Sequence, residues 1–353
     1  MTTASAGGAA VRRSSMLDVA VAAGVSPKTV SRVVNGEPHV SDRVRARVEA
    51  AIAELDFRPN AAARALASRR SSRVGMITLG GALFGPASIL DGVEAAVRSA
   101  GYFLSVTRTS RNTLEELNDA LDVLIAQGVD GVIISEPGIR DTEVARVGRA
   151  APLLWFDSPG DNHAAEDIVV GADESGASRR ATEYLLSLGH ETVWHIGGPP
   201  GWSSSARRSG GWRAALEGAG AYVPPMVAGD WSARSGFEAG LALLEHGPLT
   251  AVFTANDEMA VGAIHAFESR GLRVPADVSV IGFDDDPVAA YLHAPLTTVR
   301  QPFDEMTRIG MEKLIQVMEG EVVEHAQTSV PATLIVRQSS GPAARSDSRW
   351  ASR

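Results

Sequence analysis

Residues 16–35 read MLDVAVAAGVSPKTVSRVVN, and this stretch decides how the N-terminal part of the chain folds. Leu17, Ala20 and Val21 recur at helical spacing and predict a first helix with these side chains on one face. Gly24 suits a tight turn between helices, because glycine reaches backbone angles that other residues avoid. The stretch therefore begins as a helix followed by a sharp turn.

A second helix is predicted directly after this turn. Ser26 is a favourable N-cap, and Pro27 suits the first helical position, where a missing N–H costs nothing. At about 100° per residue, one arc collects Val30, Val33 and Val34, and the opposite arc collects Pro27, Lys28, Ser31 and Arg32. Two cations beside small residues near the start of an exposed helix are typical of major-groove readers, although an ordinary amphipathic helix pair has the same periodicity.

A third helix and a polar connection are predicted to follow. Ser41 is a candidate N-cap, and the apolar residues Val44, Val48, Ala51, Ile52 and Leu55 form one stripe that would close a three-helix core. Arg43, Arg45 and Arg47 lie off this stripe, either as a solvated face or as contacts to phosphate. Residues 61–67 (AAARALA) form a short Ala-rich helix capped by Asn60, and a helix this short is marginal alone in water.

Composition restricts the compartment. The chain has no cysteine among 353 residues, which excludes disulfides and thiolate metal sites and fits a reducing environment. No apolar run reaches the roughly 18 residues of a membrane span. Residues 1–14 lack the apolar core of a signal peptide and are expected to form a disordered leader. We therefore expect a cytoplasmic protein.

Charge is distributed unevenly along the chain. Residues 1–72 carry a net charge of +5, whereas the remaining residues carry −14, and the whole chain has −9. A small basic head on a large acidic body indicates that the head alone meets a polyanion.

From residue 73 onward, strand-like and helix-like segments alternate. Short apolar runs occupy 74–79, 103–107, 132–135, 153–156, 193–196, 251–254 and 278–283. Amphipathic segments of helical length lie between them, for example 87–100, 114–127, 176–188 and 258–270. This alternation predicts parallel sheets built from βα units, and the number of elements favours two similar lobes. Ligands bind at the carboxyl ends of strands in such folds.

Several of these segments resemble the lactose/galactose repressor family of bacterial transcription regulators. The head carries DVAVAAGVSPKTVSRVVN (18–35), and the hinge carries NAAARALASRRSSRVG (60–75). The body carries GADESGASRRATEYLLSLGH (171–190), TANDEMAVGAIHAFESRGLRVPADVSVIGFDD (254–285) and PLTTVRQPFDEM (295–306). The resemblance extends from about residue 16 to residue 340, and the body is most similar to lactose-repressor-like members that respond to glycosides.

The resemblance implies an all-α helix-turn-helix DNA-binding head and an α/β core of two Rossmann-like lobes, similar to periplasmic binding proteins. We expect a leader at 1–14, the head at 15–58, and a hinge helix and linker at 59–72. The first lobe would comprise 73–171 and 302–331, with its last helix near 303–319. The second lobe would comprise 172–301 and 332–340, before a disordered tail at 341–353. The tail lacks a Leu heptad, so we expect a homodimer that does not use it to associate further.

The resemblance also assigns the DNA contacts. The family binds pseudo-palindromic operator DNA as a symmetric dimer. Leu66 would wedge into the minor groove, and Pro27, Lys28 and Arg32 take base-reading positions. A proline at the first of these positions removes a side-chain donor. The full set of candidate DNA-binding residues is Pro27, Lys28, Thr29, Ser31, Arg32, Asn35, Asn60 and Leu66.

A small sugar or glycoside is the expected effector. Asp157, Asn256 and Asp284 follow predicted strands, where each could instead be a helix cap or turn former. By resemblance, Arg208 is the effector-binding arginine, and its two donors could fork onto hydroxyls or a carboxylate. We expect neighbouring Arg207 to be solvated. Trp231, in GDWSARSGF (229–237), would stack on the sugar, or it could be a core residue. The candidate effector-binding residues are Leu83, Pro86, Ile89, Ser135, Asp157, Ser204, Arg208, Trp231, Asn256, Asp284, Gln301 and Phe303.

Two positions depart from the family pattern. Ser135 replaces an asparagine, and Gly171 replaces a phenylalanine that packs on the ligand, so we expect Gly171 to widen the cleft.

Two other functions fit parts of the sequence. A cytosolic or exported sugar-binding protein without a regulatory role would share the body but not the basic head. An enzyme acting on glycosides is disfavoured, because three adjacent acids at 284–286 cannot straddle a glycosidic bond by themselves. The sequence contains no G-x-S-x-G motif, phosphate-binding loop, metal-ligand cluster or cofactor fingerprint. We therefore expect a regulator without catalytic activity, cofactor or metal.

The hinge residue gives a first testable prediction. Leu66→Ala should weaken operator binding and reduce operator bending, because an inserted apolar side chain supports the kink. Affinity and bend angle can be measured by gel-shift assays on circularly permuted operator fragments. An unchanged bend would contradict the wedge assignment.

Overall fold

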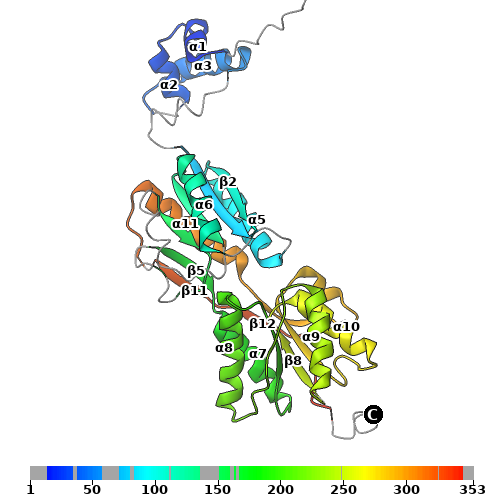
Figure 1. Cartoon of the computed structure of the whole chain (residues 1–353). Helices are drawn as coiled ribbons and strands as arrows, with labels where there is room; N and C mark the ends of the chain where they lie inside the picture. Colours follow the sequence, from blue (N-terminus) through cyan, green and yellow to red (C-terminus); the bar gives the residue numbers. More distant parts are fainter. Residues whose placement is uncertain are drawn as a thin grey trace, which may run out of the picture. The chain divides into compact units, whose positions relative to one another are not determined.

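The computed structural model describes residues 14–34, 38–57, 71–79, 83–110, 113–135, 151–159, 163, 167–247, 249–324 and 326–344. The chain divides into two compact units, Met1–Ser71 and Ser72–Arg353, and each is described by itself. Figure 1 shows their helices and strands.

The first unit is a three-helix domain. Its helices are α1 (Met16–Ala23), α2 (Pro27–Val34) and α3 (Asp42–Glu54). Gly24 ends α1 in the left-handed conformation, with φ of 59°, as the turn requires. The core of the domain consists of Val19, Ala20, Ala23, Val30, Val33, Val48, Ala51 and Phe57.

Of the three side chains predicted to share one face of α1, only Ala20 is buried. Leu17 is 61% exposed and Val21 is 76% exposed, whereas Val19, Ala20 and Ala23 are buried against the other helices. Residues 17 and 21 lie together on the side of the short helix opposite this core, because they are one helical turn apart.

One of the two predicted helix caps in this unit differs from expectation. Ser26 caps α2 as predicted, with its Oγ 3.1 Å from the Thr29 amide, but the Ser41 side chain makes no capping hydrogen bond. Arg47 on α3 donates to the carbonyl oxygens of Ala23 and Gly24, which end α1. Arg47 therefore supplies hydrogen bonds to carbonyl oxygens at the C-terminus of α1.

The second unit contains two sheets of six strands. The first sheet has the order β11-β5-β4-β3-β1-β2, and all of its pairings are parallel. Its strands are β1 (Arg73–Leu79), β2 (Phe103–Thr109), β3 (Gly131–Ser135), β4 (Leu153–Trp155), β5 (Ile168–Ala172) and β11 (Gln327–Val330). Helices α5 (Phe84–Ser99) and α11 (Phe303–Glu319) pack together against this sheet, as does α6 (Leu114–Ala126).

The second sheet repeats this plan, in the order β12-β10-β9-β8-β6-β7. Its strands are β6 (Trp194–Gly197), β7 (Val227–Ala228), β8 (Ala251–Thr254), β9 (Ser279–Asp284), β10 (Thr297–Arg300) and β12 (Thr333–Ile335), and β12 is antiparallel to β10. Helices α7 (Glu174–Ser187) and α8 (Ser203–Gly218) form one packed pair, and α9 (Ala233–Glu245) and α10 (Asp257–Ser269) form another. A short 3₁₀ helix, η3 (Pro287–Tyr291), follows β9.

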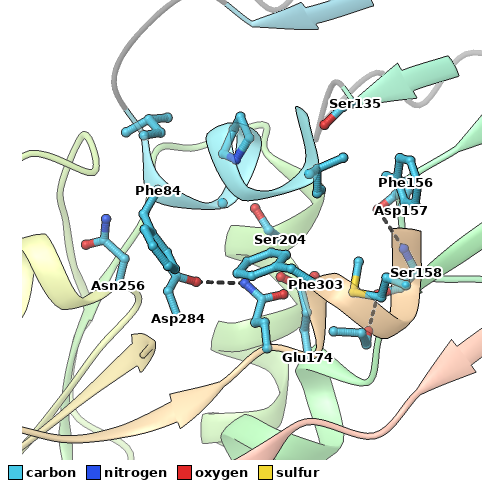
Figure 2. A pocket seen from close by; sticks show the side chains of 18 of the residues that line it. Phe84, Ser135, Phe156, Asp157, Ser158, Glu174, Ser204, Asn256, Asp284 and Phe303 are labelled. Atoms are coloured by element: carbon cyan, nitrogen blue, oxygen red, sulfur yellow. Dashed lines mark hydrogen bonds between the residues drawn. The ribbon is translucent and has the colours of Figure 1, made fainter. Parts of the chain in front are cut away.

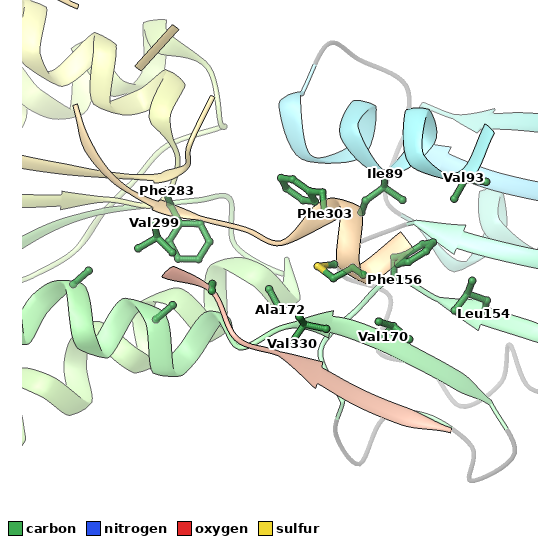
Figure 3. Close-up of a cluster of buried hydrophobic side chains, with 14 of the residues drawn as sticks. Ile89, Val93, Leu154, Phe156, Val170, Ala172, Phe283, Val299, Phe303 and Val330 are labelled. Atoms are coloured by element: carbon green, nitrogen blue, oxygen red, sulfur yellow. The ribbon is translucent and has the colours of Figure 1, made fainter. Parts of the chain in front are cut away.

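The chain passes between the two lobes three times. It crosses after β5, again between β10 and α11, and finally between β11 and β12. Helix α11 packs on α5, β4 and β5, so it belongs to the first lobe, as the resemblance implied. A buried apolar cluster continues through the crossings: Figure 3 shows Phe303 and Ala172 between Phe283 of the second lobe and Phe156 of the first.

The predicted α/β class and all seven predicted strands are present, within a few residues of the expected ends. Strands β5, β7, β10, β11 and β12 and helices α8 and α9 were not predicted from the sequence. The expected hinge, with Asn60 and Leu66, lies outside the described residues, as does Asn35.

The ends of the described chain make specific contacts. Ser14, assigned to the leader, donates from Oγ to the Leu55 carbonyl at 2.8 Å. Gly341 and Ala343, assigned to a disordered tail, bind the second lobe: Ala343 N–H donates to the Leu188 carbonyl, and Gly341 O lies 3.1 Å from His190 Nε2. Among the described residues, no helix is both long and apolar enough to cross a membrane.

A glycine allows α7 and α8 to approach closely. A Cβ added at Gly211 would lie 2.1 Å from the Ser175 carbonyl oxygen of α7, so no larger residue fits without movement of the backbone. The adjacent Gly210 faces open space, and a Cβ added there would meet no atom within 4 Å. These two positions form a matched pair on one helix.

Gly211→Ala should lower the free energy of unfolding of the core by about 1–3 kcal/mol, because it overpacks the α7–α8 contact. Gly210→Ala should raise it by about 1 kcal/mol, the usual gain when alanine replaces glycine inside an exposed helix. Urea unfolding followed by circular dichroism measures both. Equal changes in the free energy of unfolding for Gly211→Ala and Gly210→Ala would contradict the close approach of α7 and α8.

Candidate functional site

A cavity lies between the two lobes, and its volume of about 720 Å³ includes space that is open to solvent. Figure 2 shows side chains that surround it, among them Phe84, Ser135 and Asp157 of the first lobe and Ser204, Asn256 and Asp284 of the second. All twelve candidate effector-binding residues predicted from the sequence line this one cavity.

The carboxyl ends of parallel strands position the polar groups. Ser135 ends β3, Asp157 follows β4, Asn256 follows β8 and Asp284 ends β9. Parallel strands bring these ends to one edge of each sheet, and the two edges face each other across the cavity. The strand-end rule that selected Asp157, Asn256 and Asp284 therefore has a direct structural cause.

A buried ion-pair network forms the polar part of the cavity in the second lobe. Arg208 on α8 donates from Nε and Nη2 to Glu174 Oε1, at 2.9 and 2.8 Å, and from Nη1 to the Ala255 carbonyl at 2.5 Å. Its Nη1 also lies 3.5 Å from Asp284 Oδ1. Protein groups therefore bind Nε, Nη1 and Nη2 of Arg208 in this structure, and its role as an effector contact stays a prediction.

The environment shifts the protonation of two carboxyl groups. Burial raises the pKa of Asp284 to about 6, although the nearby Arg208 guanidinium and the Gln301 amide act in the opposite direction. Burial and the nearby Asp284 carboxyl raise the pKa of Asp257 well above its usual range. Asp257 lies behind the cavity and accepts hydrogen bonds from Thr298 Oγ1 and the Asp286 amide.

Aromatic side chains from both lobes line the cavity. Trp231 and Trp202 meet edge to face, with ring centroids 5.5 Å apart, in the second lobe. Phe84 and Phe303 make a similar contact at 5.9 Å on the side of the first lobe. Flat apolar faces beside carboxylates suit a ligand that carries both hydroxyl groups and C–H surface.

Trp231 is more buried than a freely accessible stacking residue. It is 5% exposed, has a positive φ of 75°, and its Nε1 has no hydrogen-bond partner among the described residues. Arg208 lies over its ring at 5.5 Å and over the Phe283 ring at 4.0 Å. Trp231 is thus both a core residue and part of the cavity wall.

Two predicted contacts are held by the protein itself. Asn256 caps α10, accepting from the Met259 amide at 2.9 Å and donating to the Trp231 carbonyl at 2.9 Å. Gln301 donates to Asp284 Oδ1 at 2.7 Å. Both line the cavity while positioning neighbouring groups, so the helix-cap alternative for Asn256 describes part of its role.

Two sequence expectations near the cavity were wrong. Arg207 is not solvated: its side chain is 21% exposed and its Nη1 lies 2.5 Å from Asp157 Oδ1. Gly171 does not open additional space, because a Cβ there would lie 2.2 Å from the Asp157 carbonyl oxygen. The absent side chain accommodates a close backbone approach between β5 and the segment after β4.

The sequence reasoning missed several residues of the cavity. Glu174 follows β5 and would have been found by the same strand-end rule had this strand been recognised. Trp202 carried no strand-end signal. The other lining residues that were not predicted are Phe84, Phe156, Ser158, Ala172 and Met306, whereas Gly85 and Gly171 line the cavity as the resemblance implied.

The three-helix unit presents the start of α2 to solvent. Pro27 and Lys28 are exposed, whereas Thr29, Ser31 and Arg32 are partly buried. The Thr29 hydroxyl lies 2.9 Å from Ser26 Oγ and so shares in the cap of α2. Cationic and small side chains near the first turn of an exposed helix have the arrangement of a major-groove recognition helix.

Sequence comparisons agree with both halves of this architecture. Residues 15–60 match the model for bacterial regulatory proteins of the lacI family, and residues 182–340 match a periplasmic binding protein-like domain. The lactose operon repressor of Escherichia coli (strain K12) is 36% identical over 329 residues, which cover 92% of this chain and 89% of that protein. The chain belongs to the LacI family.

Other LacI-family members match over a similar length. The ribose operon repressor of Escherichia coli (strain K12) is 34% identical, covering 92% of this chain and 99% of that protein. The regulator CelR of Thermobifida fusca is 35% identical, with coverage of 93% and 98%. The chain is therefore a DNA-binding transcriptional regulator with the two-lobed core of this family.

Solved structures show the same fold. A lac repressor dimer bound to operator and the anti-inducer ONPF has a TM-score of 0.86 at 34% identity, covering 94% of this chain and all of that one. A CelR–cellobiose complex has a TM-score of 0.69 at 31% identity, with coverage of 93% and 100%. Within the part of the chain that the structure describes, no cluster of three acidic, His or Cys side chains could hold a metal ion.

The raised pKa of Asp284 predicts a pH dependence of stability. Between about pH 4 and 6 the folded protein binds a proton that the unfolded chain has released, so this carboxyl destabilises the core as the pH rises through that window. Asp284→Asn removes the effect. The free energy of unfolding of wild type should fall relative to the variant by up to about 2 kcal/mol between pH 4.5 and 7.

Chemical unfolding at a series of pH values measures this difference. Asp286→Asn serves as the control, because it removes a carboxyl group from the same turn at a position outside the cavity lining. A difference between wild type and Asp284→Asn that stays constant from pH 4.5 to 7 would contradict the assignment.

Proposed function

We propose that this protein represses sugar-utilisation genes and that a small sugar or glycoside, bound between the two lobes, controls its affinity for operator DNA. One observation carries this proposal: the cavity combines buried carboxylates with aromatic faces, and both lobes contribute to its wall.

The cavity chemistry suits a neutral polyhydroxyl ligand. Asp284 and Asp157 supply carboxylate oxygens that accept hydrogen bonds from hydroxyl groups, and Ser204 and Ser135 supply hydroxyl groups. Trp231 and Phe303 supply apolar surface for the C–H faces of a sugar ring. An anionic ligand is disfavoured, because Arg208 is already paired with Glu174.

A ligand at this position can act as a switch. It would contact residues of both lobes, so its affinity depends on the arrangement of the lobes, and a difference in affinity between two arrangements shifts their populations. We propose that the hinge between head and core transmits this shift to the DNA. Two copies of the chain would place two heads on a pseudo-palindromic operator.

The proposed site residues keep their sequence-based roles. Arg32 and Lys28 would read bases, and Leu66 would kink the operator. The effector would bind the twelve predicted cavity residues. We place the protein in the cytoplasm, where operator DNA is found, and assign it no catalytic activity.

A ligand screen tests the proposal directly. The unfolding temperature of the full-length protein should rise by several degrees in the presence of one or a few sugars, because a ligand that binds the folded state alone stabilises it. The panel should contain lactose, allolactose, cellobiose, other disaccharides and simple monosaccharides. Each stabilising sugar is then added to binding assays with DNA from upstream of the gene, which also shows whether it releases or promotes binding. No stabilisation by any sugar, with DNA binding intact, would contradict the sugar assignment.

Paired substitutions separate the two activities. Arg32→Ala should weaken operator binding by about 1–3 kcal/mol and leave sugar binding unchanged. Arg208→Ala should retain DNA binding and lose the sugar response. Because Arg208→Ala removes the hydrogen-bonded partner of the buried Glu174 carboxylate, Asp284→Asn is the milder second variant. Loss of DNA binding by folded Asp284→Asn, or loss of sugar binding by Arg32→Ala, would contradict this division of roles.

A further inference from the structure

Arg207 connects the two lobes. It lies on α8 of the second lobe, and its Nη1 is 2.5 Å from Asp157 Oδ1, in the segment that follows β4 of the first lobe. Its Nη2 also donates to the Ser158 carbonyl at 3.2 Å. One guanidinium therefore binds two successive residues of the opposite lobe.

A second group of the same helix supports this contact. Ser203, at the start of α8, donates from Oγ to Asp157 Oδ1 at 3.3 Å. The two residues are one helical turn apart, so both side chains reach Asp157 from the same face of α8. The Arg207–Asp157 pair and the Ser203 bond together form what we call the lobe clasp.

The clasp is partly shielded from water. The side chains of Arg207 and Asp157 are 21% and 13% exposed, well below the exposure of the ion pairs on the outer surface of α7 and α9. Such shielding strengthens the attraction and makes loss of one partner costly.

Other charged groups lie around the clasp. Glu174 Oε2 lies 3.6 Å from Arg207 Nη1, and His163 Nε2 lies 3.4 Å from Asp157 Oδ2. Burial alone would raise the pKa of Asp157, but the facing His163 and Arg207 side chains lower it, so the carboxylate stays ionised. The pair therefore remains charged at neutral pH.

The clasp lies at the cavity. Asp157 lines the cavity, whereas Arg207 binds the same carboxylate from outside the lining set. Any occupant that contacts Asp157 thus contacts a group whose orientation Arg207 fixes. We propose that Arg207 is a positioning residue that holds Asp157 across the lobe boundary and stabilises the lobe arrangement seen here through protein contacts alone.

This proposal goes beyond the identity of the effector. Arg207 then favours one arrangement of the two lobes even without a ligand. The effector shifts an equilibrium between lobe arrangements that Arg207 has already biased. Replacing Arg207 should increase the population of cores with more separated lobes, whether or not the ligand is a sugar.

Distance measurements between spin labels test the proposal. The chain has no cysteine, so Glu115→Cys on α6 and Glu217→Cys on α8 provide one exposed label in each lobe. Labelled full-length protein is mixed with an excess of unlabelled protein, and pulsed electron paramagnetic resonance gives the distance distribution within one chain. Arg207→Met should lower the ratio of short to long distances by a factor between about 2 and about 160, the range for directly coupled residues.

Further variants show whether the change in the distance distribution arises from the Arg207–Asp157 pair. Asp157→Asn should shift the distribution in the same direction, and the double variant should add little, because the interaction is already lost in either single variant. Arg213→Met, which removes an exposed arginine from the same helix, should leave the distribution as in wild type.

Circular dichroism confirms that each variant is folded, and if Arg207→Met does not fold, Asp157→Asn carries the test. A distribution for folded Arg207→Met that superimposes on wild type would overturn the proposal, as would additive shifts in the double variant. The experiment contains neither sugar nor DNA, so its failure is distinguishable from failure of the proposed function.

Discussion

The buried pair between Arg208 and Glu174 is the interaction on which the cavity depends. A charged guanidinium is stable in this place only because Glu174, the Ala255 carbonyl and Asp284 surround it and the Phe283 ring lies 4.0 Å below it. Glu174 begins α7 and Arg208 lies on α8, so the pair requires these helices to approach closely. Gly211 permits that approach. The buried ion pair of the cavity therefore depends on the close packing of α7 against α8 in the second lobe.

The arrangement of the strands explains why both lobes contribute to one cavity. Each sheet presents the carboxyl ends of its parallel strands, and the three crossings of the chain place these ends opposite each other. The apolar cluster that runs through the crossings joins the lobes at one side, whereas Arg207 and Asp157 join them at the cavity. A small molecule bound between them is well placed to alter their arrangement.

Much of the site could be predicted from the sequence, because strand ends follow a general rule. Asp157, Asn256 and Asp284 stood after recognisable apolar strands, and parallel strands must collect their carboxyl ends at one edge. Glu174 was missed because the preceding strand, IVVGA, was not recognised. Adjacent arginines posed a different problem: Arg207 and Arg208 point about 100° apart on a helix, and only packing decides what each one meets. The first helix poses a similar problem, since its eight residues offer more than one apolar face and only packing decides which one is buried.

Thermodynamic linkage is the most direct test of whether the cavity and the DNA-binding head are coupled. For a stabilising sugar, the dissociation constant for operator DNA is measured with and without the sugar, and the dissociation constant for the sugar is measured with and without operator. Both dissociation constants should change by the same factor, because coupling between two binding sites is reciprocal. A sugar that binds with the same affinity whether or not operator is present would contradict this coupling.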